Sequence, residues 1–138
     1  MRMKRHALHR QDRGAAVLAL VVTSATHAPL IREHLAEAPY VGWLFATLSA
    51  VSVLLAVALL VADTRVVWAA TGVLGAASVL AFLLSRTTGL PQIGDDVGNW
   101  SEPLGYPAIA AESVVVLAAY LTLRRAARRP DAVTTPSA

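Results

Sequence analysis

The sequence predicts an all-α membrane protein, built as an antiparallel four-helix transmembrane bundle with both termini cytoplasmic. The first reason is composition: 56% of the residues are hydrophobic and 15% are charged, whereas soluble domains carry about 25% charged residues. The second reason is that four apolar segments come close to the ~20 residues that a membrane-spanning helix needs. We expect the spans at about 14–28, 40–62, 66–85 and 106–123.

The first segment, 14–28, is the weakest of the four. Its apolar centre is only "AAVLALVV", and Thr23 and Ser24 follow directly. A basic start and a short apolar stretch also describe a secretory signal peptide. However, "TSATHA" is a poor cleavage site, and the helix can continue beyond Pro29. We therefore expect a retained span, with a cleaved signal as the alternative.

The second and third segments, 40–62 and 66–85, are the clearest candidates for two consecutive antiparallel spans. The second has no charged residue, and the "DTR" that follows it is too short for anything but a tight antiparallel turn. In the third segment, Gly72 and Ala76 have the small-xxx-small spacing that lets helix backbones approach closely in lipid. We expect this pair to face a helix and to offer a contact for another membrane protein or a second copy, although general alanine richness explains the spacing equally well.

The fourth segment, 106–123, contains an acid, Glu112, at roughly 9 Å below the outer boundary. A charged residue at mid-helix costs about 2.5–3.5 kcal/mol on insertion scales, so Glu112 should face the bundle interior with a partner. The candidate partners are Arg86 and His27, at the outer ends of the third and first spans. Three readings stay open: an ion pair that joins two helices, a site for a ligand, ion or proton, and a protonated carboxyl without a role.

The placement of charge predicts the orientation. With both termini cytoplasmic, ten arginine and lysine residues lie on that side, against Arg32 and Arg86 on the other, which is the bias typical of cytoplasmic loops. We expect a basic cytoplasmic tail at 1–13, a transmembrane domain at 14–123, and a basic and then disordered tail at 124–138. The expected location is the cell inner (cytoplasmic) membrane. Basic residues that abut apolar segments, without an aromatic or glycine pattern, argue against nucleic acid as a partner.

The aromatic residues also fall near the expected membrane boundaries, where their rings prefer to lie. Near the outer boundary we expect Tyr40, Trp43, Trp100 and Tyr106. Trp68 and Tyr120 are expected near the inner boundary.

The outer connections carry most of the acidic side chains. The first, "PLIREHLAEAP", predicts a short helix with Pro29 at its start. The second lies within "SRTTGLPQIGDDVGNWSEPLGYP" and is rich in turn-forming residues. We expect it to cap the outer face with Asp95, Asp96, Trp100 and Glu102.

Four residues near the first connection form a candidate metal set: His27, His34, Glu33 and Glu37. Two histidines and carboxylates can hold zinc or copper, but solvated loop residues give the same pattern, and the H-E-x-x-H order is absent. Beyond a metal ion or haem at this face, no cofactor is indicated. The chain also lacks cysteine, a P-loop, a dinucleotide fingerprint and a nucleophile elbow, so we do not expect an enzyme.

Three features of the sequence together resemble a known group: "SRTTGLP", the following "EPLG", and the acid inside the last span. They are similar to a pattern in small, uncharacterised four-span membrane proteins of actinobacteria, and "EHLAE" before an aromatic-led span fits the same pattern. The resemblance covers roughly 27–112. It implies the four-span topology and a bacterial source, and it carries no activity.

Two functions remain as expectations. The first is a non-enzymatic accessory, interaction or sensor subunit, in which the polar groups pair with one another. The second is binding or transport of a metal ion, haem, a proton or a small solute under the outer connections, in which His27, Arg86 and Glu112 converge on a cavity.

Overall fold

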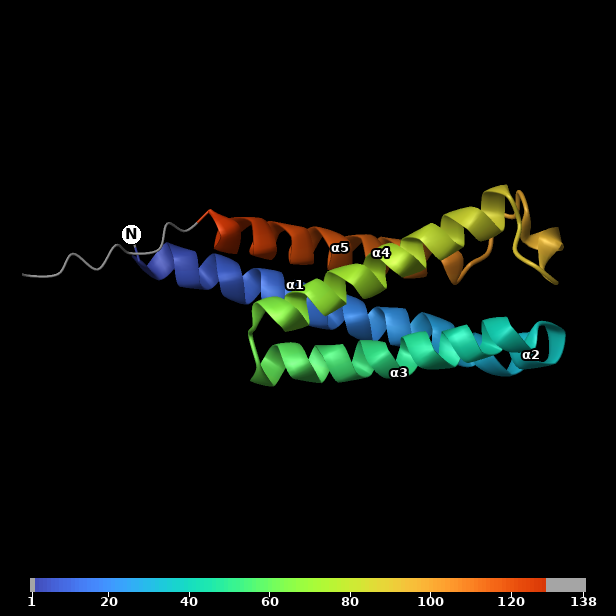
Figure 1. The fold of residues 1–138 in the computed structure, drawn as a ribbon, viewed down its shortest axis with the longest axis horizontal. Helices are drawn as coiled ribbons and strands as arrows, with labels where there is room; N and C mark the ends of the chain where they lie inside the picture. Colours follow the sequence, from blue (N-terminus) through green and yellow to red (C-terminus); the bar gives the residue numbers. More distant parts are fainter. Residues whose placement is uncertain (1, 129–138) are drawn as a thin grey trace, which may run out of the picture.

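The computed structural model describes residues 2–128, with side chains from Arg10 onward (Figure 1). The helices in chain order are α1 (Arg2–His27), η1 (Ala28–Leu30), α2 (Ile31–Glu37), α3 (Pro39–Val61), α4 (Arg65–Thr87), η2 (Gly94–Asp96) and α5 (Gly105–Ala127). Within the described residues there is no strand, and one isolated bridge joins Leu90 and Ile93. The all-α prediction is confirmed.

Four stretches are long and apolar enough to cross a membrane: Arg10–Glu37, Pro39–Val61, Arg65–Thr87 and Gly105–Ala127. The chain is therefore a multi-pass membrane protein with a four-helix bundle. The first stretch is longer than the span expected at 14–28, because the chain stays helical through η1 and α2. The short helix expected in the first connection is present as α2, but it begins at Ile31, and Pro29 lies in the preceding η1.

Local sequence sets the ends of the helices. Pro39 occupies the first turn of α3, where its missing N–H leaves no donor unsatisfied. The Thr64 side chain accepts a hydrogen bond from the Val67 backbone N–H at 3.3 Å and caps α4. At the other end of α4, Gly89 has a φ of +78° and donates its N–H to the Leu84 carbonyl at 3.0 Å. This left-handed glycine stops the helix and turns the chain back over it.

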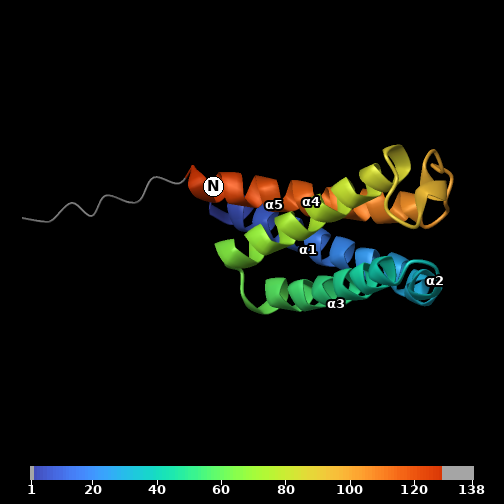
Figure 2. The same cartoon turned by 45° about the vertical axis from the view of Figure 1, so that its right-hand side comes forward.

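The four long helices form two pairs, α1 with α3 and α4 with α5, and the pairs diverge toward one end. Helix α1 packs against both α3 and α5, and α4 packs against α5, whereas α3 and α4 have far less contact with each other. In both ribbon views, α3 and α4 meet at their short turn and then separate toward the end that carries α2 and the long α4–α5 connection (Figures 1 and 2). We call this the loop end.

The opposite end holds the first and last described residues, Arg2 and Arg128, and side chains join its helices. Arg125 of α5 forms an ion pair with Asp12 of α1, and Arg65 Nη2 donates to the Ala126 carbonyl at 3.1 Å. The basic segment expected as a tail at 1–13 belongs to α1, apart from Met1, which is not described. The disordered tail expected at the end of 124–138 lies outside the described residues from 129 onward.

The main core takes buried side chains from all four long helices and is densest where α1 and α5 approach each other. Small residues such as Ala16, Ala19 and Ala119 allow this close approach, and Leu20 and Val115 fill the spaces between them. Trp68, which the sequence places at a lipid boundary, belongs to this core instead. Its side chain is 1% exposed, and its indole Nε1 donates to Asp63 Oδ1 at 2.6 Å.

The small-residue contact between α4 and α5 differs from the expected Gly72–Ala76 pair. A Cβ on Gly72 would lie 3.0 Å from Ala119 Cβ, and a Cβ on Gly75 would lie 2.9 Å from Val115 Cγ1. Ala76 is exposed. The contact face therefore consists of Gly72 and Gly75, three residues apart, because α4 crosses α5 along a different row of its surface.

Candidate functional site

A cavity of about 270 Å³ lies between the two helix pairs at the loop end. Its walls are mostly apolar, with side chains such as Leu48 of α3 and Leu74 of α4. Its polar lining includes the three residues that the sequence predicts to converge on a cavity, His27, Arg86 and Glu112. The structure therefore brings together, around one cavity, groups that come from α1, α4 and α5.

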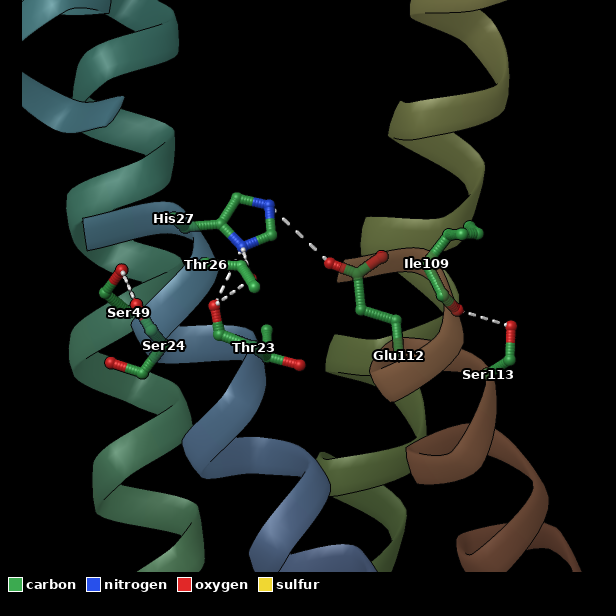
Figure 3. A network of polar contacts seen from close by, with 8 residues as sticks. All are labelled: Thr23, Ser24, Thr26, His27, Ser49, Ile109, Glu112 and Ser113. Carbon is green, nitrogen blue, oxygen red and sulfur yellow. Dashed lines mark hydrogen bonds and ion pairs between the residues drawn. The ribbon is translucent and has the colours of Figure 1, made fainter. Parts of the chain in front are cut away.

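His27 is the last residue of α1 and is held by its own helix. Its Nδ1 lies 2.8 Å from the Thr23 carbonyl oxygen and 3.3 Å from Thr26 Oγ1. Because a carbonyl can only accept a hydrogen bond, Nδ1 carries the proton. The other ring nitrogen, Nε2, is therefore directed away from the helix backbone and toward α5 (Figure 3).

Glu112 faces His27 from α5, and the two side chains point toward each other (Figure 3). Glu112 Oε1 lies 3.7 Å from His27 Nε2, which is too far for a hydrogen bond. Glu112 is 2% exposed, and within the described part of the chain no group donates a hydrogen bond to its carboxyl. Of the two partners that the sequence offers, Glu112 thus faces His27 and not Arg86.

Arg86 instead holds the long connection 88–104, which we call the roof loop. The guanidinium forms ion pairs with Asp96, at 2.8 Å between Nη1 and Oδ1, and with Glu102. It also lies over the Phe82 ring, 5.2 Å from the centroid. The Arg86 carbonyl accepts a hydrogen bond from Gly98 N–H at 2.9 Å. One buried residue therefore fixes the roof loop on the end of α4.

The roof loop also reaches across to α3. Ile93 is buried with Ala38 and Val41, and Leu90 packs against this cluster. The Tyr40 hydroxyl donates to the Pro91 carbonyl at 2.6 Å. The loop thus bridges the two helix pairs at the point where they are furthest apart, and it covers the cavity.

The residues expected to cap the outer face have different positions. Asp96 and Glu102 bind Arg86, and Trp100 packs edge-to-face on Phe82 with centroids 6.3 Å apart. Asp95 is exposed in η2. The sequence identified the loop as a cap but did not predict that its acids are neutralised by the arginine at the end of the preceding helix.

The candidate metal set does not come together. The described residues contain no group of three or more histidine, cysteine, aspartate or glutamate side chains that could hold a metal ion. Glu33 and Glu37 are exposed on α2, while His34 lines the cavity. The His34 Nδ1 is paired with the Leu30 carbonyl at 3.0 Å. The turn at Pro29 separates His27 from the other three residues, and within α2 the two acids lie on the exposed side, away from the cavity that His34 lines.

Sequence reasoning missed Phe45 of α3. Its ring contacts both histidines, with centroids 4.9 Å from His27 and 4.7 Å from His34, and it lines the cavity. Nothing in the sequence distinguishes this phenylalanine from the other apolar residues of α3, because that helix is apolar on every side.

The chain was also compared with known proteins. No family model, no curated protein and no solved structure matches it. The resemblance to the actinobacterial group therefore stays a prediction.

Proposed function

We propose that this multi-pass membrane protein is a non-enzymatic binding protein that holds a small, partly apolar molecule in the cavity at its loop end. The observation that supports it most directly is the Glu112–His27 pair, whose facing polar atoms line a mostly apolar cavity and form no hydrogen bond with each other. Ligand sites are typically apolar cavities with a few convergent polar groups. Such a role fits a sensor or accessory subunit.

The geometry favours binding over catalysis. His27 commits Nδ1 to the backbone, and within the described part of the chain its Nε2 faces a carboxylate and no hydroxyl. A nucleophile with an adjacent base is therefore not assembled there.

We further propose that the protein lies in the inner (cytoplasmic) membrane of a bacterium, with both termini in the cytoplasm and the loop end outside. The excess of arginine beside the termini supports this orientation. The partners are then the lipid bilayer and, through the exposed Ala76, another membrane protein or a second copy. Gly72 is already used within the chain, so such an association needs Ala76 alone from the expected pair.

The binding role can be tested with a single thiol, because the chain has no cysteine. Ser78 lines the cavity on α4, and Ser78→Cys can be labelled with N-ethylmaleimide in membrane vesicles. The probes are three compounds with the same apolar body: 4-tert-butylbenzyl alcohol, 4-tert-butylbenzylamine and 4-tert-butylbenzoate. We expect at least one of them to slow the labelling of Ser78→Cys in a saturable manner.

The matched control is Ser101→Cys, in the exposed part of the roof loop, whose labelling should not depend on the probes. Ala108→Leu enlarges a side chain of the cavity wall and should weaken the protection. If none of the three probes changes the labelling rate of Ser78→Cys, the binding role is wrong.

A further inference from the structure

The most exposed side of the cavity lies between α3 and α4. All of its lining residues that are exposed lie on these two helices: Leu44, Thr47, Ala77 and Ala81. The same two helices diverge from their turn, with little contact between them (Figures 1 and 2). The roof loop covers the end of the cavity. In a membrane protein, the open side therefore faces the acyl chains of the lipids.

The polar atoms inside the cavity need hydrogen-bond donors. With Nδ1 protonated, the Nε2 of a neutral His27 is an acceptor, and an ionised Glu112 offers carboxylate oxygens, which also accept. These two groups are 3.7 Å apart with no donor between them. Two acceptors that face each other in an apolar site leave both groups unsatisfied, which is unfavourable.

The charged residues around the cavity also favour a ligand that donates hydrogen bonds, and in particular a cation. Asp96, Glu102 and Glu112 line it, against the single arginine Arg86. Because Arg86 is already paired with the two roof-loop acids, the carboxylate of Glu112 is left without a fixed cation. A ligand with a positive charge and several N–H donors would satisfy both Glu112 and His27.

We propose that the cavity takes a lipophilic primary amine, which reaches it sideways from the bilayer between α3 and α4 and places its ammonium between Glu112 and His27. This proposal rests on the binding role proposed above and names the class of ligand. The ammonium has three N–H donors, so it can donate to both acceptors at once. A hydroxyl has only one donor, and a carboxylate has none. The apolar body of the amine occupies the part of the cavity near Leu48 and Leu74.

The test compares the three probes on Ser78→Cys by the concentration that halves the labelling rate. We expect the amine to act at about a tenfold lower concentration than the alcohol, since a charge-assisted hydrogen bond is roughly twice as strong as a neutral one. The benzoate should be the weakest. Adding Glu112→Gln should remove the advantage of the amine, whereas Asp95→Asn, which changes an exposed acid of the roof loop outside the cavity lining, should preserve it.

Each result separates the two proposals. If the alcohol or the benzoate protects as well as the amine, the binding role stands and the amine is wrong. If no probe protects, both fail. If the amine keeps its advantage in the Glu112→Gln protein, the proposed position of the ammonium is wrong. The comparison of probes on Ser78→Cys alone remains decisive if the Glu112→Gln protein does not fold.

A further pair of variants tests whether the amine enters the cavity from the bilayer between α3 and α4. Ala81→Trp places a large ring at the opening, and we expect it to raise the half-protecting amine concentration several-fold. Val73→Trp changes an exposed residue of α4 outside the cavity lining and should leave this concentration unchanged. Equal values for Ala81→Trp and the parent protein would exclude access between α3 and α4.

Discussion

At the scale of single residues, Arg86 has the most contacts that bear on the site. It is 5% exposed, and its guanidinium binds two acids of the roof loop and lies on Phe82. The Nε of this buried side chain has no hydrogen-bond partner among the described residues. Arg86 therefore depends on the charges of Asp96 and Glu102, and the loop depends on Arg86.

We expect Arg86→Gln to release the roof loop. The variant removes a charge that two acids share, and the free energy of unfolding should fall by about 1–3 kcal/mol. Limited proteolysis should then cut within 88–104, while unfolding in detergent measures the loss of stability. Arg32→Gln, which changes an exposed arginine of α2, is the matched control. A roof loop that stays protease-resistant in Arg86→Gln would contradict the role given to this residue.

At the scale of elements, the spans could be predicted from hydropathy alone, because length and apolarity decide whether a helix crosses lipid. The packing between the spans could not be predicted in the same way. Which small residue of α4 meets α5 depends on the crossing angle, and the structure uses Gly75 where the sequence pattern favoured Ala76. Trp68 shows the same limit, since its aspartate partner at the turn draws it into the core.

Gly75 provides the element-scale prediction. A Cβ at this position would lie 2.9 Å from Val115 Cγ1 and 3.1 Å from the Glu112 carbonyl oxygen, so Gly75→Ala must push α4 away from α5. Adding a carbon atom to a well-packed contact typically lowers the free energy of unfolding by about 1–3 kcal/mol. Unfolding of the purified protein in detergent measures this change. Ala76→Leu, on the exposed face next to it, should have little effect, and the same loss in both variants would argue against the packing described.

The candidate site was predicted only in part, for physical reasons. Glu112 is the one acidic residue within the span expected at 106–123, and His27 lies near the end of the span expected at 14–28, so the cost of burying such groups identified them in the sequence. Their mutual distance could not be predicted, because it depends on how far α1 and α5 approach through Ala16, Ala19 and Ala119. The roof loop could not be predicted either, since its fold depends on contacts distant in sequence, such as that between Tyr40 and Pro91.

At the scale of the whole molecule, the ends of α1 and α5 lie together and are joined by Asp12 and Arg125 (Figure 1). This agrees with four crossings, because an even number of crossings returns the chain to the side of the membrane on which α1 begins. Helix α1 also supplies Ala16, Ala19 and Leu20 to the core, so the bundle as described requires this helix. A mature protein that has lost α1 would lack one wall of the cavity.

The orientation can be tested with reporters fused after Ala138. We expect a fluorescent protein there to be bright and alkaline phosphatase to be inactive, because the arginine-rich side stays in the cytoplasm. Intact-mass measurement of the same protein should show that α1 is retained. An active phosphatase fusion would reverse the proposed orientation, and a shortened mature chain would support a cleaved signal.

Because the cavity opens between α3 and α4, its occupancy depends on the concentration of the ligand in the lipid and not on that in the water. A molecule that arrives through the acyl chains is sampled at its level in the lipid phase, so occupancy follows the partition coefficient as well as the fit inside the protein. Each additional methylene favours transfer out of water by about 0.8 kcal/mol. Lengthening an alkyl tail should therefore lower the aqueous dose required without any change in the contacts made by Glu112.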